Sequence, residues 1–208
     1  MRIFAVGING LAMTRHLPEE ERRSQILQAA RRCFVSQGYF TTRMEDIARQ
    51  AGLSKGGVYF HFAGKRELFE ALVREEYRQS MDFLKQVSGQ PRSYIELFES
   101  VARHFLNFFQ QRPDYPRFLM VMGEMAGRDE SIRRLLADLQ QQYTEVLAGL
   151  IRQGVEAGAL RPVDERSAAI ILKGIIDAVE SYMALGVPLD VDRLVATGMD
   201  LLKNGLSA

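Results

Sequence analysis

The chain has 208 residues, of which 47% are hydrophobic and 25% charged, values typical of a soluble globular protein with one or two domains. A single cysteine excludes an internal disulfide framework, and three scattered histidines argue against a structural zinc site. No apolar run reaches the roughly 18 residues that a membrane-spanning helix needs. We therefore expect a cytoplasmic protein that uses no metal, no cofactor and no membrane partner.

The net charge of +1 conceals an uneven distribution. Residues 1–65 hold ten Lys and Arg residues against five Asp and Glu residues (+5), whereas residues 66–208 hold seventeen against twenty-one (−4). A basic head on a mildly acidic body indicates a polyanionic partner at the head, although such a split also arises by chance.

The first residues, MRIFAVGINGLA, place one arginine before a largely apolar stretch, as in a weak signal peptide. Asn9 and two glycines interrupt this stretch, and no small-residue cleavage site precedes the charged segment that follows. Met13 offers a second start of translation. We predict that residues 1–16 form a flexible N-terminal arm.

The remaining chain is predicted to be all-α, since no stretch alternates apolar and polar residues in the period of a strand. Caps at Thr42 and Ser54, left-handed glycines and prolines mark the helix ends. These signals delimit about nine helices, at residues 17–38, 42–52, 54–60, 65–88, 93–112, 116–127, 129–158, 164–186 and 191–203. We assign residues 17–64 to a helical head and residues 65–208 to a helical body.

The second and third predicted helices, joined at Gly52, form a helix-turn-helix pattern. The second helix of such a pair lies in the major groove of DNA. Lys55 at its start suits a phosphate, and Gly56 and Gly57 lack a Cβ, so that the backbone can approach a duplex closely. Because glycines inside a helix cost roughly 1 kcal/mol each, their presence calls for such a reason.

Further polar groups follow in the same segment. Tyr59 and His61 offer hydrogen-bonding tips, and Lys65 opens the next helix beside another expected phosphate. The alternative is that Tyr59 and His61 are buried, but Phe60 and Phe62 already supply apolar bulk at this place.

The segments that carry the pattern are residues 38–39, 41–42, 46–48, 51–54, 55–62 and 65–69, which read GY, TT, DIA, AGLS, KGGVYFHF and KRELF. In this order and without gaps, they resemble the DNA-binding domain of the tetracycline-repressor (TetR) family over about residues 22–72, a quarter of the chain. The resemblance implies an all-helical homodimer whose heads bind a palindromic operator. It also implies that the bodies hold an effector and pair through their last two helices, and that the effector usually lowers operator affinity.

The resemblance also implies which positions contact DNA. These are Thr42, Lys55, Gly56, Tyr59, His61 and Lys65. Tyr59, His61 and Lys65 would contact phosphates, and Lys55 and Gly56 would meet base edges or the adjoining backbone. Arg43 departs from the family pattern, which often has threonine or serine there, and is placed to reach a more distant phosphate.

Several charged or reactive residues are expected to be structural. Arg49 and Arg66 are interpreted as solvated charges or members of ion pairs, and Glu75 and Glu76 as a solvated pair. Cys33 is expected to pack in the apolar face of the first helix. With no nucleophile and base, no catalytic pair of carboxylates and no metal set, we predict that the protein is not an enzyme.

The body is rich in Phe and Met, whose side chains can line an apolar pocket or simply fill a core. A few polar residues interrupt these apolar stretches, and they are candidates for orienting a ligand. The candidate ligand-binding residues are His104, Phe105, Phe108, Met120, Glu124, Tyr143 and Asp177. Glu180 interrupts the same apolar run as Asp177. The expected effector is small and hydrophobic or amphipathic.

The last two predicted helices are more apolar than one internal face requires, which favours a four-helix dimer interface over burial within one subunit. The candidate interface residues are Ile171, Ile175, Val179, Leu194 and Leu201.

Together these observations predict a dimeric, ligand-responsive transcriptional regulator, most simply a repressor. The effector would tilt the long fourth helix and so change the spacing of the two heads. The alternative is a protein-interaction module, which the basic head and its phosphate-binding residue types argue against.

Overall fold

The computed structural model describes residues 18–88 and 93–204, and every regular element within these ranges is an α-helix, as predicted. The predicted N-terminal arm lies outside the described residues. The head contains α1 (Glu19–Gln37), α2 (Met44–Ala51) and α3 (Lys55–His61). The body contains α4 (Lys65–Ser88), α5 (Tyr94–Gln111), α6 (Tyr115–Arg128), α7 (Glu130–Glu156), α8 (Glu165–Ala184) and α9 (Val191–Asn204).

The helices of the head end where the sequence predicts. Gly38 and Gly52 follow α1 and α2 with φ of 80° and 67°, conformations that residues with a Cβ rarely adopt. Ser54 caps α3, because its hydroxyl accepts a hydrogen bond from the Gly57 backbone N–H at 3.1 Å.

The predicted cap of α2 is wrong by one residue. Arg43 is the N-cap, and its backbone N–H donates to the Asp46 carboxylate at 3.0 Å. The Thr42 hydroxyl is buried and donates instead to the Gly38 carbonyl at 2.7 Å, so that it closes the turn between α1 and α2. A buried hydroxyl is stable here because it finds a backbone acceptor.

The hydrophobic core of the head continues into the body. Ile26, Ile47 and Val58, one from each head helix, are fully buried in the same cluster as Phe69 of α4 and Phe118 of α6. The Cys33 side chain packs in this cluster too, as expected. Because apolar packing is close and transmits strain, a shift of α4 or α6 must be felt by the head.

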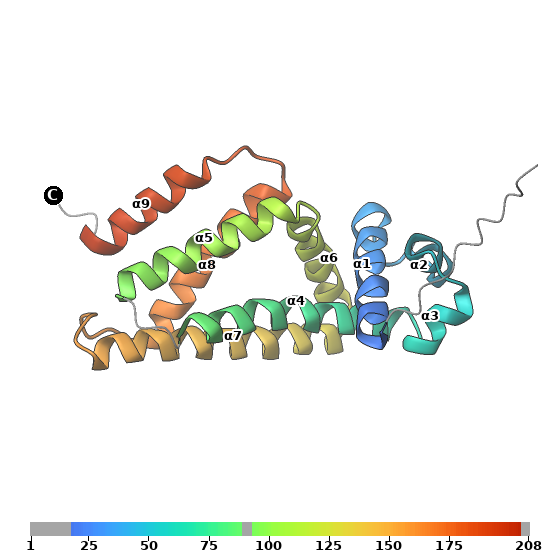
Figure 1. Ribbon diagram of the computed structural model, residues 1–208, viewed down its shortest axis with the longest axis horizontal. Coiled ribbons are helices and arrows are strands. Elements are labelled where there is room, and N and C mark those ends of the chain that lie inside the picture. The colour runs from blue at the N-terminus through green and yellow to red at the C-terminus, as the bar shows by residue number, and fades with distance from the viewer. Residues whose placement is uncertain (1–17, 89–92, 205–208) are drawn as a thin grey trace, which may run out of the picture.

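Figure 1 shows the head at one end of an elongated molecule, with α4 and α7 side by side along the body. Helix α8 packs on α7, and α9 lies against α5 on the outside. A second cluster of buried side chains, with Phe105 and Tyr143 near its middle, joins α4, α5, α7 and α8. No described helix is long and apolar enough to span a membrane.

An ion-pair network crosses the boundary between head and body. Arg31 of α1 bonds to Glu76 of α4 at 2.9 Å and to Asp114, the N-cap of α6, at 2.7 Å, while Arg112 reaches Glu76 at 2.9 Å. The prediction that Glu75 and Glu76 are both solvated is therefore wrong for Glu76, which is buried. Consecutive helical residues point about 100° apart, so Glu75 turns outward to Arg78 while Glu76 turns inward.

Candidate nucleic-acid interface and body cavity

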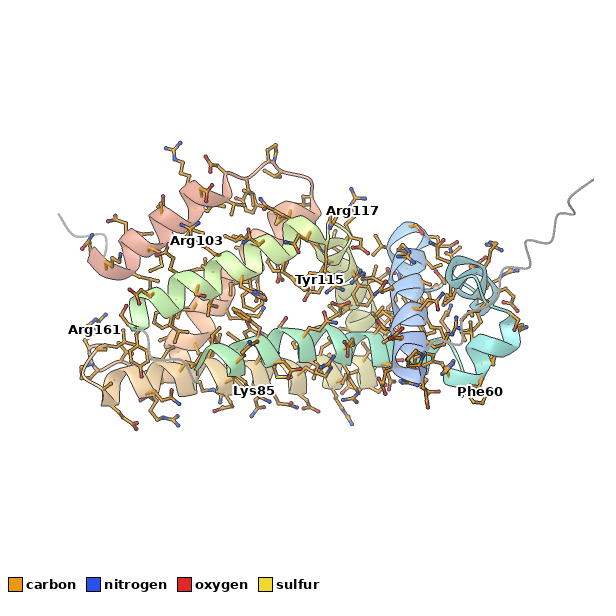
Figure 2. The ribbon with its side chains drawn as sticks, viewed as in Figure 1. Phe60, Lys85, Arg103, Tyr115, Arg117 and Arg161 are labelled. Atoms are coloured by element: carbon orange, nitrogen blue, oxygen red, sulfur yellow. The ribbon has the colours of Figure 1, made fainter. Side chains whose placement is uncertain are left out.

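Helix α3 buries one face and presents the other to solvent. Val58 and Phe62, four residues apart, are buried in the head core. Tyr59 is exposed, and Phe60 is 83% exposed, so the expectation that Phe60 supplies core bulk is wrong. Figure 2 shows Phe60 on the outside of the head. A helical wheel centred on Val58 would have indicated this position, because Phe60 lies two residues on and therefore faces away.

Gly56 sits in the exposed surface of α3, and the fold does not require a glycine there. A Cβ built on Gly56 meets no atom within 4 Å, and the residue has ordinary helical φ. Gly57 differs, because its Cβ would lie 3.3 Å from the Ser54 hydroxyl that caps the helix. The absence of a side chain at Gly56 thus leaves open surface where another molecule can approach the backbone.

The two basic residues nearest this surface differ in their bonding. Lys55 pairs with Glu45 of α2 at 2.5 Å, and both side chains are largely exposed. Its ammonium also lies 5.7 Å from the centre of the Tyr59 ring. Arg43 is exposed at the start of α2. An exposed ion pair contributes little to stability, so Lys55 can exchange Glu45 for another anion at small cost.

Lys65 and His61 lie at the edge of this face. The Lys65 ammonium donates to the carbonyls of Tyr39 at 2.7 Å and Thr42 at 2.8 Å, and its partial burial lowers its pKa. His61 is partly exposed, and its carbonyl accepts a hydrogen bond from Arg23 at 3.0 Å. In this conformation Lys65 ties the start of α4 to the turn before α2, so Lys65 and Thr42 hold the helix-turn-helix unit together from within.

Two other arginines behave as expected. Arg49 pairs with Asp46 at 2.6 Å, and Arg66 pairs with Glu70 and with Asp129, both at 3.1 Å. The pair between Arg66 and Asp129 joins the start of α4 to the start of α7. Together with the network around Glu76, it gives the part of the body next to the head a second polar contact between helices.

The body contains a partly open cavity of about 370 Å³. Four of the seven predicted ligand-binding residues line it: Phe105, Met120, Tyr143 and Asp177. Glu180, which interrupts the same apolar run as Asp177 in the sequence, lines the cavity as well. The other lining residues are Tyr77, Ser80, Tyr115, Pro116, Leu119, Gln140, Lys173, Ile176, Ser181 and Ala184. Figure 2 labels Tyr115, which joins the wall from the first residue of α6.

The other three predicted ligand-binding residues lie elsewhere. His104 stacks on Phe83, with 3.4 Å between ring centroids, and Glu124 pairs with Arg128 at 3.4 Å on the outside of α6. Phe108 lies under the guanidinium of Arg112, 4.6 Å from its ring centroid. A polar residue within an apolar run can be recognised from the sequence, but the neighbouring helix that its side chain faces cannot. The direction of the side chain is set by how the helices pack.

The cavity holds a small set of charged and polar groups. Lys173 forms an ion pair with Asp177 one turn later on α8, and its ammonium lies 5.3 Å from the centre of the Tyr143 ring. Glu180 is 8% exposed, and burial raises the pKa of its carboxyl to about 7. The Tyr77 hydroxyl donates to Gln140 at 3.2 Å. In the sequence, the i, i+4 spacing of Lys173 and Asp177 on one predicted helix could have indicated this ion pair.

A second, smaller cavity of about 150 Å³ lies beside the first and is almost wholly apolar. Its walls come from α5, α7, α8 and α9, and Phe105 and Ile176 belong to both cavities. These two apolar side chains therefore form part of the boundary between the two spaces. No group of three metal-binding side chains occurs among residues 18–88 and 93–204.

Large apolar side chains are exposed on the last two helices and the segment between them. Ile171 is 65% exposed and Ile175 is 56% exposed, and Leu194 and Leu201 are exposed on α9. Val179, the fifth predicted interface residue, is half-buried against the small core between α5 and α9. The exposed members of this surface, called the α8–α9 face below, are Ile170, Ile171, Ile175, Tyr182, Leu185, Val187, Leu194, Leu201 and Leu202.

Comparison with known proteins agrees with this architecture. Residues 26–72 match the family model described as bacterial regulatory proteins, tetR family, and residues 91–206 match the tetracyclin repressor-like C-terminal domain. The chain is 27% identical over 211 residues to the HTH-type transcriptional regulator TtgR of Pseudomonas putida, with 92% of this chain and 97% of that protein covered.

Solved structures share the fold. The fatty acid degradation regulator FadR from Bacillus halodurans superimposes with a TM-score of 0.79 at 20% identity, over 91% of this chain and 98% of that one. FadR from Bacillus subtilis, solved in complex with stearoyl-CoA, has a TM-score of 0.76 at 21% identity, over 88% of this chain and 99% of that one. With the helix-turn-helix head in place and the C-terminal model matching more than half of the sequence, this chain belongs to the TetR family and is a DNA-binding transcriptional regulator.

Proposed function

We propose that the protein is a homodimeric repressor that binds a palindromic operator and leaves it when a small amphipathic effector enters the body cavity. The observation that carries this proposal is the position of the cavity. Its wall includes Tyr77 and Ser80 of α4 and several residues of α8. Helix α4 begins at Lys65, next to α3, and α8 carries much of the α8–α9 face, so a ligand there touches both the helix that leads to the head and the expected dimer contact.

The proposed DNA contacts follow the exposure of α3. Gly56 allows close approach, Tyr59 and His61 contact phosphates, and Lys55 meets DNA after releasing Glu45. Arg43 extends the contact at the start of α2. Thr42 and Lys65 act by positioning, since their polar atoms already bond to backbone carbonyls of the turn before α2. The DNA-binding unit then comprises residues 17–64, and residues 65–208 bind effector and partner.

Dimerisation uses the α8–α9 face in this proposal. Ile171, Ile175, Leu194 and Leu201 are exposed apolar side chains of α8 and α9, and apolar surface of this kind favours burial against a second copy. Helices α8 and α9 of two subunits would form a four-helix bundle, as is typical of the family. Val179 lies under this face and supports it.

The effector would act on the distance between the heads. Two recognition helices read successive major grooves only when they are about 34–36 Å apart. Because α4 connects the cavity wall to the head core and the Arg31–Glu76 pair ties α4 to α1, a tilt of α4 moves the head. A coupling of about 1–3 kcal/mol would lower operator affinity about 5–150-fold.

An effector with a long apolar part is supported by the second cavity and by one relative. The Bacillus subtilis FadR structure contains stearoyl-CoA, a ligand with a long acyl chain. In this chain the apolar cavity adjoins the polar one at the residues Phe105 and Ile176, which line both. Rotation of these two side chains would join the spaces.

The test is selection of bound duplexes from a random DNA library at two salt concentrations, followed by release of the selected duplex with candidate effectors. We expect one palindromic sequence, bound more weakly at high salt because phosphate contacts release counterions. Recovery of no sequence in the presence or absence of candidate effectors, together with salt-independent capture of a protein, would favour the alternative that the head is a protein-interaction module.

A further inference from the structure

Glu180 is a largely buried residue of the cavity wall whose carboxylate has no direct partner among the described residues. Its side chain is more than nine-tenths buried. Among the described residues, none donates a hydrogen bond to this carboxylate or lies within ion-pair distance of it; Lys173, the nearest cation to act on it, is engaged with Asp177. An ionised carboxylate that is largely buried without a partner is costly, so above the pH at which the carboxyl loses its proton this position favours a cationic group beside it.

Tyr143 provides a second unsatisfied group in the same wall. Its side chain is 2% exposed, and its hydroxyl has no hydrogen-bond partner within the described structure. Buried hydroxyls normally find a partner, and an unpaired one that lines a cavity points to a bound molecule. The hydroxyl lone pairs can accept a hydrogen bond from an N–H donor.

The charge balance of the cavity is negative. Two carboxylates, Asp177 and Glu180, face one ammonium, that of Lys173. The remaining wall is uncharged: it combines the polar residues Ser80, Gln140 and Ser181 with apolar and aromatic side chains, among them those of Tyr77, Tyr115 and Tyr143. In such a partly water-excluded space an anionic headgroup would be repelled by the excess carboxylate, whereas a cation would be attracted by the carboxylate and by the aromatic faces.

We propose that the effector of this regulator is an amphipathic cation, a protonated amine or amidine joined to an apolar body. Its N–H groups donate to the Glu180 carboxylate and to the Tyr143 hydroxyl. Its apolar part lies against Phe105 and Ile176 and extends into the second cavity. This inference rests on the proposed function, because it names the ligand class of the same cavity, and it differs from the anionic acyl-CoA seen in the Bacillus subtilis relative.

The test uses three ligands with the same alkyl chain and different head charges: decylammonium, decanoate and decan-1-ol. Binding to the full-length protein is measured by isothermal titration calorimetry at pH 8, below the micellar concentration of each ligand. We expect decylammonium to bind at least tenfold more tightly than the other two. In Glu180→Gln, which keeps the size of the side chain, the preference for the cation should fall at least tenfold, and Tyr143→Phe should reduce it less.

The matched control is Glu145→Gln on α7. Glu145 lies outside the cavity and pairs with Arg166 on the surface, so its variant should keep the full preference. Equal or tighter binding of decanoate, or an unchanged preference in Glu180→Gln, would overturn the inference. If decanoate or decanol bound and released the selected duplex, the ligand class would be wrong and the proposed function would stand. If cavity ligands bound but left duplex affinity unchanged, the proposed function would fail by itself.

Discussion

Arg31 of α1 and Glu76 of α4 form an ion pair of 2.9 Å that is almost closed to solvent, with only 9% and 2% of the two side chains exposed. Arg31 belongs to the head, and Glu76 lies one residue before Tyr77, which lines the body cavity. The second Glu76 oxygen is buried without a described partner, and burial raises the pKa of this carboxyl to about 7. The Arg31–Glu76 pair is therefore a largely buried polar contact between the head and α4, the helix that would contact the effector.

Arg31→Met should destabilise the protein by about 3 kcal/mol, because it removes the buried cation that Glu76 and Asp114 share and leaves Glu76 only the more exposed Arg112. The free energy of unfolding from urea titrations would measure this loss. Arg78→Ala, which removes an exposed arginine of α4 that pairs with Glu75 and Asp82, should cost less than about 1 kcal/mol. Similar losses of unfolding free energy in the two variants would show that the buried Arg31–Glu76 pair contributes no more to stability than an exposed pair.

Gly56→Ala should separate DNA affinity from stability. The new methyl group meets no atom of the protein, and alanine favours a helix, so the melting temperature should stay the same or rise. Affinity for the selected duplex should nevertheless fall at least tenfold, because the Cβ occupies the space where the DNA backbone or a base edge approaches. Full affinity measured by fluorescence anisotropy would remove Gly56 from the proposed interface.

Phe60 and Phe62 form a matched pair for the two faces of α3. Phe62→Ala should cost about 3–5 kcal/mol, because it opens a cavity in the head core. Phe60→Ala should change the free energy of unfolding by no more than about 0.5 kcal/mol, since the ring is in solvent. Urea titration of both variants checks the prediction, and a large loss in Phe60→Ala would mean that the register of α3 differs.

The stability of the protein should depend on pH through Glu180. The pKa of its carboxyl is raised to about 7 in the folded protein by burial, although Lys173 opposes the shift, whereas the unfolded chain has the ordinary value near 4.5. Between these values the folded state holds a proton that the unfolded state has lost, so the contribution of Glu180 to stability is full below pH 4.5 and disappears by about pH 7. The neighbours that face it are Lys173, Asp177, Tyr77, Tyr115 and Tyr143.

Glu180→Gln removes this dependence. Relative to the variant, the unmodified protein should lose roughly 3 kcal/mol of unfolding free energy between pH 4.5 and 7.5. Urea titrations of both proteins at the two pH values measure the difference, and Glu145→Gln serves as the control on the surface. A difference that stays constant with pH would place the Glu180 carboxyl in a more solvated setting.

Ile171→Glu combined with Ile175→Glu should convert the proposed dimer into monomers. Both side chains are more than half exposed in the single chain, so the charges cost little in the monomer but cannot be buried between two copies. Sedimentation velocity gives the mass, and circular dichroism confirms the fold. A doubly substituted protein that still sediments as a dimer would exclude the α8–α9 face as the contact.

The helices and the helix-turn-helix unit follow from local signals in the amino-acid sequence. Their signals are local: Gly38 and Gly52 end helices because they adopt positive φ, Ser54 caps α3 with its own hydroxyl, and apolar side chains recur with the helical period. These effects act within a few residues of chain. The burial of Val58 and the packing of Cys33 against the head core follow from the same periodicity.

Which side of each helix contacts which neighbouring helix depends instead on how the helices pack together. Glu76 and Glu75 are adjacent in sequence, yet only Glu76 is buried, because α1 and α6 supply its arginine and its aspartate neighbour from elsewhere in the chain. The same holds in the body, where Glu180 faces a cavity and Glu124 faces solvent. A polar residue in an apolar helix indicates that the residue has a polar partner or faces solvent. Which of these holds depends on the position and rotation of the neighbouring helices, because the contacts are made between residues that are distant in sequence.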